Sequence, residues 1–480
     1  MGNDRPAELM LYESQRGAIR MALAGELIVT RALRPFREPE YLRLVELVRG
    51  ADVAFGNSEC LFHDYEGPPA PDNSGTYMRA DPRLIEDLKW MGFGMVACAQ
   101  NHAYDYGDAG VLANIRHLDE YGLAHAGTGA TLSLAQSPAY LDTPKGRVAL
   151  VAATDHLNGG TYGRAVDPRG DVPGKPGIHH IRVQASYTVD GEAMAALRRI
   201  SQHLGWDQRN LDLEGVMAWL QGRARVAIGD PEGPPFELGL RGEYGGMAPL
   251  HFRAGNHFET HYTLNEEDVA ATLGWIEDAR RMADWVIFSI HHFSPGYPTG
   301  LQGSPYDEPG ENIVRLAHHA IDAGADAVVG HGPHRDQAIE LYRGKPIFYS
   351  LGDFILQSDT VLRQPASAYT RRRLPPNAPL SAFYEDRSGG QSQGQAILRD
   401  QWQSTLAVVD WDDRRLAEIR LYPVDLGMGL PTGQRGRPVL AGETVGREVL
   451  DRLRRCSEPF GTFIHTEDGV GIIRPAGAVD

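Results

Sequence analysis

Polar side chains that are able to bind metal ions follow one apolar run after another in this sequence, as Glu26 follows MALAG and His331 follows AVVG. In chain order these residues are Glu26, Asn57, Glu59, Asn101, His102, His291, His292, His331 and His334. In open α/β sheets, ligands bind at the carboxyl ends of the strands, where the loops converge. Five run ends that each deliver a carboxylate, carboxamide or imidazole group are hard to explain by packing alone.

This mixture of donor groups suits a site for two divalent metal ions. A carboxylate can bridge two cations, and neutral imidazoles complete the coordination while positions stay open to water. Mn, Fe and Zn are the metals that such mixed nitrogen and oxygen ligands favour. Two metals about 3.5–4 Å apart lower the pKa of a bridging water and hold the attacking and leaving oxygens. The pattern therefore predicts a metal-dependent hydrolase that uses a metal-bridged hydroxide.

The local patterns differ in how specific they are. The stretch His331-Gly332-Pro333-His334 is the most specific, because a Gly-Pro loop directly after an apolar run brings two imidazoles together. Side chains alternate between the two faces of a strand, so His292 should point away from His291 and support the site from behind. Residues 255–257 repeat an Asn-His pair, but no clear buried strand precedes them, and we interpret this stretch as a loop.

Short apolar runs alternate with helical patterns in the first third of the chain, which is typical of an α/β fold. We expect strands at 19–29, 53–55, 93–99 and 147–154, and helices at 38–48, 81–92 and 108–122. The alternation returns later with a helix at 265–282 and strands at 285–290 and 325–329. These elements should place the candidate ligands at one edge of the sheet structure.

Two segments rich in Gly and Pro interrupt this order. Residues 155–262 are interpreted as a long insertion, and the polar residues 363–401 as a mobile surface loop. Residues 402–480 should supply strands and a helix that complete a single domain over 1–480. We expect both segments to form walls or a lid over the site, because loops on a rigid sheet shape specificity.

Composition excludes some partners. The 480 residues include 47 Lys and Arg and 63 Asp and Glu, for a formal charge of −16, which opposes binding to nucleic acid or an anionic membrane. No apolar stretch approaches about 18 residues, and the first residues lack the apolar core of a secretory signal. Three scattered cysteines form no disulfide framework or zinc ribbon. We expect a cytoplasmic protein with a small-molecule or oligomeric substrate, no nucleic-acid or membrane partner, and an oligomeric state that stays open.

Eight stretches together carry a family resemblance. They are AGELIVTRAL (24–33), GNSE (56–59), QNHAYDYGDAGV (100–111), HAGTG (125–129), KPG (175–177), SIHHF (289–293), GADAVVGHGPH (324–334) and GKPIFYSLGDF (344–354). With these motifs the chain resembles the CapA-type proteins of poly-γ-glutamate capsule synthesis, which belong to the calcineurin-like metallophosphoesterase superfamily. The resemblance implies a four-layer α/β/β/α sandwich with a dinuclear metal site at its centre.

The resemblance also implies a role for each matched residue. Glu26 and Glu59 correspond to the acids of the first two motifs, and Glu59 is expected to bridge the metals. The further ligands that it implies are Asn101, His291, His331 and His334, and the general acid that protonates the leaving group is His102. Candidates for substrate contact or for support of the ligands are Asn57, Arg79, Asp105, His292, Arg335 and Asp353.

The sequence departs from the family pattern at several points. Glu26 stands where Asp is usual, and Ile28 stands where the wider superfamily has a His. Residues 293–295, Phe-Ser-Pro, replace a Glu that often follows the fourth-motif His. These differences predict that one metal is held weakly or by other ligands. The membrane anchor of many capsule-synthesis members is also missing, which argues against a direct role in an assembled capsule machine.

Three functions fit these residues. The first is hydrolysis of a phosphoester, and the second is hydrolysis of an amide such as a γ-glutamyl bond. Both reactions pass through an oxyanion that metals stabilise, so the ligands alone do not separate them. The third is a non-catalytic binding or assembly protein on the same fold. A histidine placed to act as an acid beside the metals favours catalysis, since a binding protein does not need one.

Overall fold

The fold is known from a computed structural model that describes residues 17–71, 75–158, 160–206, 208–210, 236–239, 250–293, 308–412 and 414–475. The chain divides into two compact units. The first unit comprises Met1–Arg182 and Glu266–Asp480, and the second comprises Val183–Asn265. Several sheets of mixed strand direction alternate with helices, which confirms the predicted α/β class.

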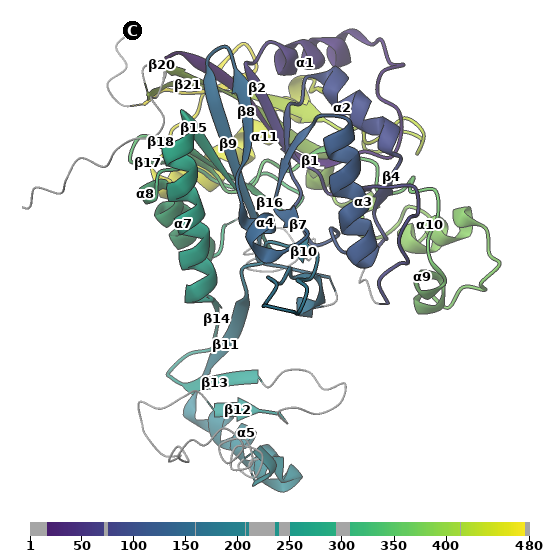
Figure 1. Cartoon of the computed structure of the whole chain (residues 1–480), viewed down its shortest axis with the longest axis vertical. Helices are drawn as coiled ribbons and strands as arrows, with labels where there is room; N and C mark the ends of the chain where they lie inside the picture. The colour runs from purple at the N-terminus through teal and green to yellow at the C-terminus, as the bar shows by residue number, and fades with distance from the viewer. Residues whose placement is uncertain are drawn as a thin grey trace, which may run out of the picture. The chain divides into compact units, whose positions relative to one another are not determined.

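A ten-stranded sheet forms one half of the first unit, with β1 (Ile19–Ile28) in its interior (Figure 1). β1 is parallel to β2, and the parallel order continues to β5 and β6. β19 also pairs with β1 in parallel, whereas β20 pairs with it in antiparallel orientation. The partner strands are β2 (Val53–Asn57), β5 (Met95–Ala97), β6 (Ala124–Ala126), β19 (Asp353–Leu356), β20 (Gln403–Asp412), β21 (Arg415–Asp425), β22 (Val439–Leu440), β23 (His465–Glu467) and β24 (Val470–Ile473).

A six-stranded sheet forms the other half, and its central strands β16, β15 and β9 are parallel. In spatial order its strands are β17 (Ile339–Tyr342), β18 (Lys345–Phe348), β16 (Ala327–His331), β15 (Trp285–His291), β9 (Gly146–Thr154) and β8 (Ala139–Thr143). Two helices contact these strands, α7 (Glu266–Met282) against β9 and β15 and α8 (Glu311–Asp322) against β16 (Figure 1).

Apolar side chains cover both faces of β1. Met21 and Leu23 join a core that also holds Leu150 of β9 and Ile287 of β15, so this core lies between the two sheets. The intervening residues of β1 face a second core with α1 (Pro39–Arg49) and α2 (Ile85–Met91). A strand that is buried on both faces reads as a continuous apolar run, which is how residues 19–29 stand in the sequence. The site described below therefore has a rigid frame.

Further elements belong to the first unit. They are β3 (Leu61–Phe62), β4 (Arg79–Ala80), α3 (Gly107–Glu120), β7 (Thr128–Gly129), α4 (Leu132–Gln136), β10 (Gly177–Ile178), α11 (Glu443–Ser457) and the 3₁₀ turns η1 (Pro82–Leu84), η2 (Gly160–Gly163) and η6 (Glu458–Phe460). Gly92 ends α2 with φ 112°, as its position in the sequence predicts. No helix in the described part of the chain has the length and apolarity that crossing a membrane requires.

The segment 363–401 differs from the expected irregular loop. It contains the helices α9 (Ala366–Arg371) and α10 (Leu380–Ser388) and the 3₁₀ turns η4 (Gly394–Ile397) and η5 (Arg399–Trp402). Phe383 and Tyr369 pack in a small core with Tyr77. The prolines and glycines misled the prediction because they mark helix ends: Pro365 and Pro379 are N-cap residues, and a left-handed glycine follows α10.

The second unit has its own four-stranded sheet. Its elements are β11 (Val183–Val189), α5 (Gly191–Leu204), β12 (Phe236–Leu238), β13 (Leu250–Ala254) and β14 (Glu259–Leu264). It begins at Val183, whereas the predicted insertion begins at 155, because residues 155–182 pack with the first unit. Residues 211–235 and 240–249 of the expected insertion lie outside the described residues.

Candidate metal centre

Glu26 is aimed into the site by an irregularity in β1. The pairing of β1 with β19 shifts register at Glu26, and its pairing with β2 shifts just before it. Such a bulge changes the direction of a side chain on the affected strand. The carboxylate is fully buried, where Oε1 accepts a hydrogen bond from the Gly332 N–H at 2.7 Å and Oε2 accepts one from Asn57 Nδ2. Burial, together with the nearby Glu59, raises the pKa of Glu26 well above its usual value.

Glu59 lies between two imidazole rings. Its Oε1 is 3.7 Å from His291 Nε2 and 3.7 Å from His334 Nε2. His291 Nε2 is also 3.5 Å from Glu26 Oε1. Burial alone would raise the pKa of Glu59, but the two histidines hold this pKa below its usual value. The Glu59 carboxylate is therefore the central acceptor of the cluster.

The acids and histidines of the cluster form two overlapping groups of potential ligands. Glu26, Glu59 and His291 form one group, and Glu59, His334 and Asp353 form the other. Within each group one ligand atom from every residue lies within 4.8 Å of the others. Glu59 belongs to both groups, so two cations held by these residues would share it.

His334 and Asp353 are directly hydrogen bonded. His334 Nδ1 lies 2.8 Å from Asp353 Oδ1, which leaves Nε2 on the side of Glu59. Asp353 begins β19 and is the register partner of Glu26 on β1. Burial lowers the pKa of His334, but Asp353 and Glu59 outweigh it and raise this pKa to about 10. A carboxylate that holds one nitrogen of a histidine fixes which nitrogen faces a metal.

The position of the Gly332 backbone explains why a glycine stands in the loop between His331 and His334. Gly332 has φ 107°, and a Cβ atom there would lie 2.3 Å from the His292 carbonyl oxygen. Only glycine fits this close approach, which brings the Gly332 N–H to Glu26. His334 follows with φ 55°, which is uncommon for a residue with a side chain and typical of functional sites.

Several buried polar atoms of the cluster have no hydrogen-bond partner among the described residues. They are Glu59 Oε2, Asp353 Oδ2, Asn57 Oδ1, Asn101 Oδ1 and both ring nitrogens of His291 and of His331. Leaving a buried donor or acceptor unpaired costs about 1–3 kcal/mol each. Oxygen and imidazole donors are also the ligands that Mn, Fe and Zn prefer. On both counts the residues fit a divalent metal centre.

His102 is held at the edge of the cluster by Asp105. His102 Nδ1 lies 2.8 Å from Asp105 Oδ2, and the same oxygen accepts the Met78 N–H at 2.7 Å. Burial lowers the pKa of His102, but Asp105 outweighs it and the pKa is raised. The dyad leaves Nε2 of His102 as the nitrogen for contact with another molecule.

A cavity of about 230 Å³ adjoins the cluster, and its lining includes Glu59, His102 and His334. Segment 363–401 also contributes Arg387, Gln395, Leu398 and Gln401 to this lining. Segment 363–401 therefore forms part of the wall of this cavity. The corresponding role of the insertion stays a prediction.

His331 and His292 are members of neither of the two ligand groups. His331 ends β16 as the register partner of His291, and its ring lies 5.8 Å from that of Phe55. His292 Nε2 lies 2.9 Å from the Tyr349 carbonyl oxygen, behind the cluster. The position of His292 agrees with the alternation of side chains along a strand.

The two arginines expected near the substrate are engaged elsewhere. Arg79 Nε donates to the His63 carbonyl at 2.7 Å, and Arg335 Nη2 forms a 2.8 Å ion pair with Asp400. Neither belongs to the described lining of the cavity. Folding brings an acceptor next to each arginine, and the sequence alone does not show these contacts.

Sequence reasoning missed two residues of the site. Asn158 Oδ1 lies 3.4 Å from Asn101 Nδ2, and Asn158 Nδ2 lies 3.4 Å from His102 Nδ1. Asn158 comes four residues after β9, so the rule of polar residues at strand ends would have found it. Arg387 of α10 had no such signal, because it follows no strand.

Comparison with known proteins assigns the chain to a family. The family described as Bacterial capsule synthesis protein PGA_cap matches residues 21–358. The chain belongs to this family. The family is part of the metallophosphoesterase-like superfamily.

Individual relatives differ in how much of the chain they match. "Uncharacterized protein y4uA" of Sinorhizobium fredii is 35% identical over 95% of this chain and 92% of that protein. A probable polyglutamine synthesis accessory protein of Mycobacterium tuberculosis is 43% identical over 18% of this chain and 20% of its own length. The capsule biosynthesis protein CapA of Bacillus anthracis is 22% identical over 62% of this chain and 51% of its own.

Proposed function

We propose that this PGA_cap family member is a metal-dependent hydrolase with a dinuclear centre. The observation that carries the proposal is that Glu59 belongs to both ligand groups, which is the arrangement a bridging carboxylate requires. The proposed ligands are Glu26, Glu59, His291, His334 and Asp353, with Asn101 and His331 completing the two coordination shells. Asp353, until here a candidate for substrate contact or for support of the ligands, is proposed as a ligand. Its donor atom would be Oδ2, which has no partner among the described residues.

The residues around the centre would divide the work of hydrolysis. When bound, two divalent cations supply Lewis acidity, which lowers the pKa of water and stabilises negative charge in the transition state. His102, oriented by Asp105, donates a proton from Nε2 to the leaving group in the adjoining cavity. Asn57 and the Gly332 N–H hold the Glu26 carboxylate in place.

A phosphoester is the preferred substrate. Membership of the metallophosphoesterase-like superfamily supports this choice. A centre with two cations also matches the in-line displacement at phosphorus, in which both the attacking and the leaving oxygen need stabilisation. We also propose that the two packed sheets and their outer helices form the four-layer α/β/β/α sandwich of that superfamily.

Hydrolysis of an amide is the second candidate. The Mycobacterium tuberculosis relative is named for polyglutamine synthesis, and polyglutamine is joined by amide bonds. The same histidine would then protonate a leaving amine. A non-catalytic role in binding or assembly is the third possibility that an activity test addresses.

A substrate panel tests these alternatives. The purified protein, supplied with Mn²⁺ or Zn²⁺, is assayed on bis(p-nitrophenyl) phosphate, p-nitrophenyl phosphate and γ-glutamyl-p-nitroanilide. We expect metal-dependent cleavage of a phosphoester that the variant Glu59→Gln lacks. Cleavage of the anilide alone would replace the phosphoester by the amide. No cleavage of any substrate by a metal-loaded protein would contradict a hydrolase of either kind.

A further inference from the structure

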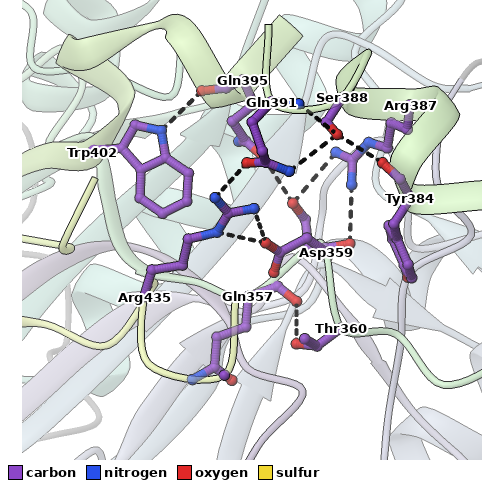
Figure 2. Close-up of polar contacts among 12 residues, drawn as sticks. Gln357, Asp359, Thr360, Tyr384, Arg387, Ser388, Gln391, Gln395, Trp402 and Arg435 are labelled. Atoms are coloured by element: carbon purple, nitrogen blue, oxygen red, sulfur yellow. Dashed lines mark hydrogen bonds and ion pairs between the residues drawn. The ribbon is translucent and has the colours of Figure 1, made fainter. Parts of the chain in front are cut away.

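A second cavity lies beside the one at the metal cluster. It measures about 300 Å³, and its lining includes Asp359, Tyr384, Gln391, Trp402 and Arg435 (Figure 2). Two further residues, Arg387 and Gln395, line both cavities. The wall between the cluster and the second cavity is therefore made in part by a guanidinium and a carboxamide group.

The two arginines of this region are in different electrostatic states. Arg435 is neutralised by Asp359, whose Oδ2 accepts from its Nε at 2.8 Å, and its Nη1 donates to the neutral Gln391 Oε1 at 2.6 Å. Arg387 donates only to the neutral oxygens of Ser358, at 3.0 Å to the carbonyl and 3.3 Å to Oγ. Among the carboxylates that the structure describes, none forms an ion pair with Arg387. Figure 2 shows the contacts of Arg435 with Asp359 and Gln391, and it shows Arg387 on the other side of Asp359.

An arginine without a carboxylate partner in this position favours the binding of an anion. Its side chain is half-buried, and a charge withdrawn from water is costly unless it is paired. Burial is the largest cause that lowers the pKa of Arg387; Tyr384 and Asp359 act in the opposite direction, and Arg372 and Arg435 lower it. Arg372 itself is paired with Asp386 at 2.9 Å. Arg387 is thus the arginine of this cavity lining that has no ion pair among the described residues, and the Glu385 carboxylate also belongs to the lining.

We propose that Arg387 binds an anionic group of the substrate that is separate from the bond to be cleaved. The carboxylate or phosphate of such a group matches the paired N–H donors of a guanidinium. The substrate extends from the metal cluster past Arg387 into the second cavity. There Gln391 and Gln395 offer amide groups, and Tyr384 and Trp402 offer ring surface. This inference rests on the proposed function, since it assigns a second recognition point to the same substrate.

The choice of anion is tested by calorimetric titration of the metal-loaded protein. The probes are succinate, inorganic phosphate and the uncharged succinamide, and the proteins are wild type, Arg387→Gln, Arg387→Lys and the control Arg399→Gln. Arg399 lies in the same segment, lines neither cavity, and forms an exposed pair with Glu448. Thermal melting checks that each variant is folded.

We expect Arg387→Gln to bind one of the two anions about 10- to 100-fold more weakly than wild type, the range for losing a hydrogen bond to a charged group. Arg387→Lys should recover part of the loss, and Arg399→Gln should bind as wild type. Weaker binding of succinate by Arg387→Gln identifies the substrate group as a carboxylate, and weaker binding of phosphate identifies it as a phosphate. If Arg387→Gln does not fold, weaker anion binding by Arg387→Lys supports the proposal instead.

Equal affinity of both anions for wild type and Arg387→Gln, or no binding of either anion to wild type, would overturn the inference. Phosphate that binds the metals does so in every variant and does not depend on residue 387. Because binding is measured without turnover, an inactive protein that still shows the Arg387 effect would contradict the hydrolase and leave the anion site standing.

Discussion

The two ligand groups that meet at Glu59 are built in different ways. In the first group the Glu26 carboxylate is fixed by Asn57 and by a backbone N–H, while the two ring nitrogens of His291 have no hydrogen-bond partner among the described residues. In the second group the histidine and the acid hold each other, since His334 Nδ1 lies 2.8 Å from Asp353 Oδ1. Burial lowers the pKa of His291 to about 4, whereas that of His334 is raised to about 10.

The difference teaches how the site compensates for departures from the family pattern. Glu26 is one methylene longer than the usual Asp, and the bulge in β1 together with two hydrogen bonds places its longer side chain. In the second group Asp353 supplies a carboxylate from β19, a strand that pairs with β1. We infer that residues outside the first group hold its Glu26 carboxylate in place, whereas in the second group His334 and Asp353 hold each other.

The largest effect is expected for Glu59, because it belongs to both groups. Glu59→Gln removes the shared charge, and we expect the metal content measured by mass spectrometry to fall from about two ions per chain to near zero. Hydrolysis should be lost with the metals. The control Glu120→Gln changes an exposed acid of α3 and should keep both metals. Retention of both ions by a folded Glu59→Gln would separate the two groups and refute the bridge.

His102→Ala tests catalysis without touching either group. The variant should keep its metals and lose about 10²- to 10⁴-fold in turnover, the range for one positioned proton donor. The loss should shrink for substrates with good leaving groups, which need no proton. The matched control is His318→Ala, which removes an imidazole of α8 that stacks on Tyr342. Full activity of His102→Ala on a poor leaving group would show that the acid is a different residue.

Asp353→Asn should weaken the second group selectively. Asparagine keeps the shape of the side chain but removes the charge that orients His334 and that the proposed ligand atom Oδ2 carries. We expect metal affinity to fall by at least about 10- to 100-fold, the range for loss of the orienting partner alone. Metal titration should show one weakened site and one unchanged site. Two sites weakened equally would mean that the groups are not independent.

Asn57→Ala should have the smallest effect. It removes one of the two hydrogen bonds on Glu26, and the Gly332 N–H still holds the other oxygen. We expect a loss of about 10-fold in affinity at the first site only, at the low end of the range for supporting residues. Metal titration in parallel with Asp353→Asn provides the measurement. An effect larger than that of Asp353→Asn would reverse the comparison between the groups.

Much of the frame was predictable from the sequence, because buried strands stand as apolar runs. The expected strands at 19–29 and 147–154 correspond to β1 and β9, and Gly92 ends α2 as predicted. The residues at the strand ends were also found, since Glu26, Glu59, His291 and His334 come together around one point. Their roles as metal ligands stay predictions.

What could not be predicted depends on contacts between distant parts of the chain. Arg79, Arg335 and Asp353 were all candidates for substrate contact or for support of the ligands. The sequence does not show that Asp64 and Asp400 pair with the two arginines. The closeness of Asp353 to Glu59 depends on the pairing of β19 with β1. The helices in 363–401 were hidden because the prolines and glycines at helix ends resemble those of an irregular loop.

Anomalous diffraction from crystals of the Mn²⁺-loaded protein tests whether Glu59 bridges two metal ions. We expect two anomalous peaks about 3.5–4 Å apart, with one between Glu26, His291 and Glu59 and the other between His334, Asp353 and Glu59. A single peak, or two peaks of which one does not touch Glu59, would contradict the bridge.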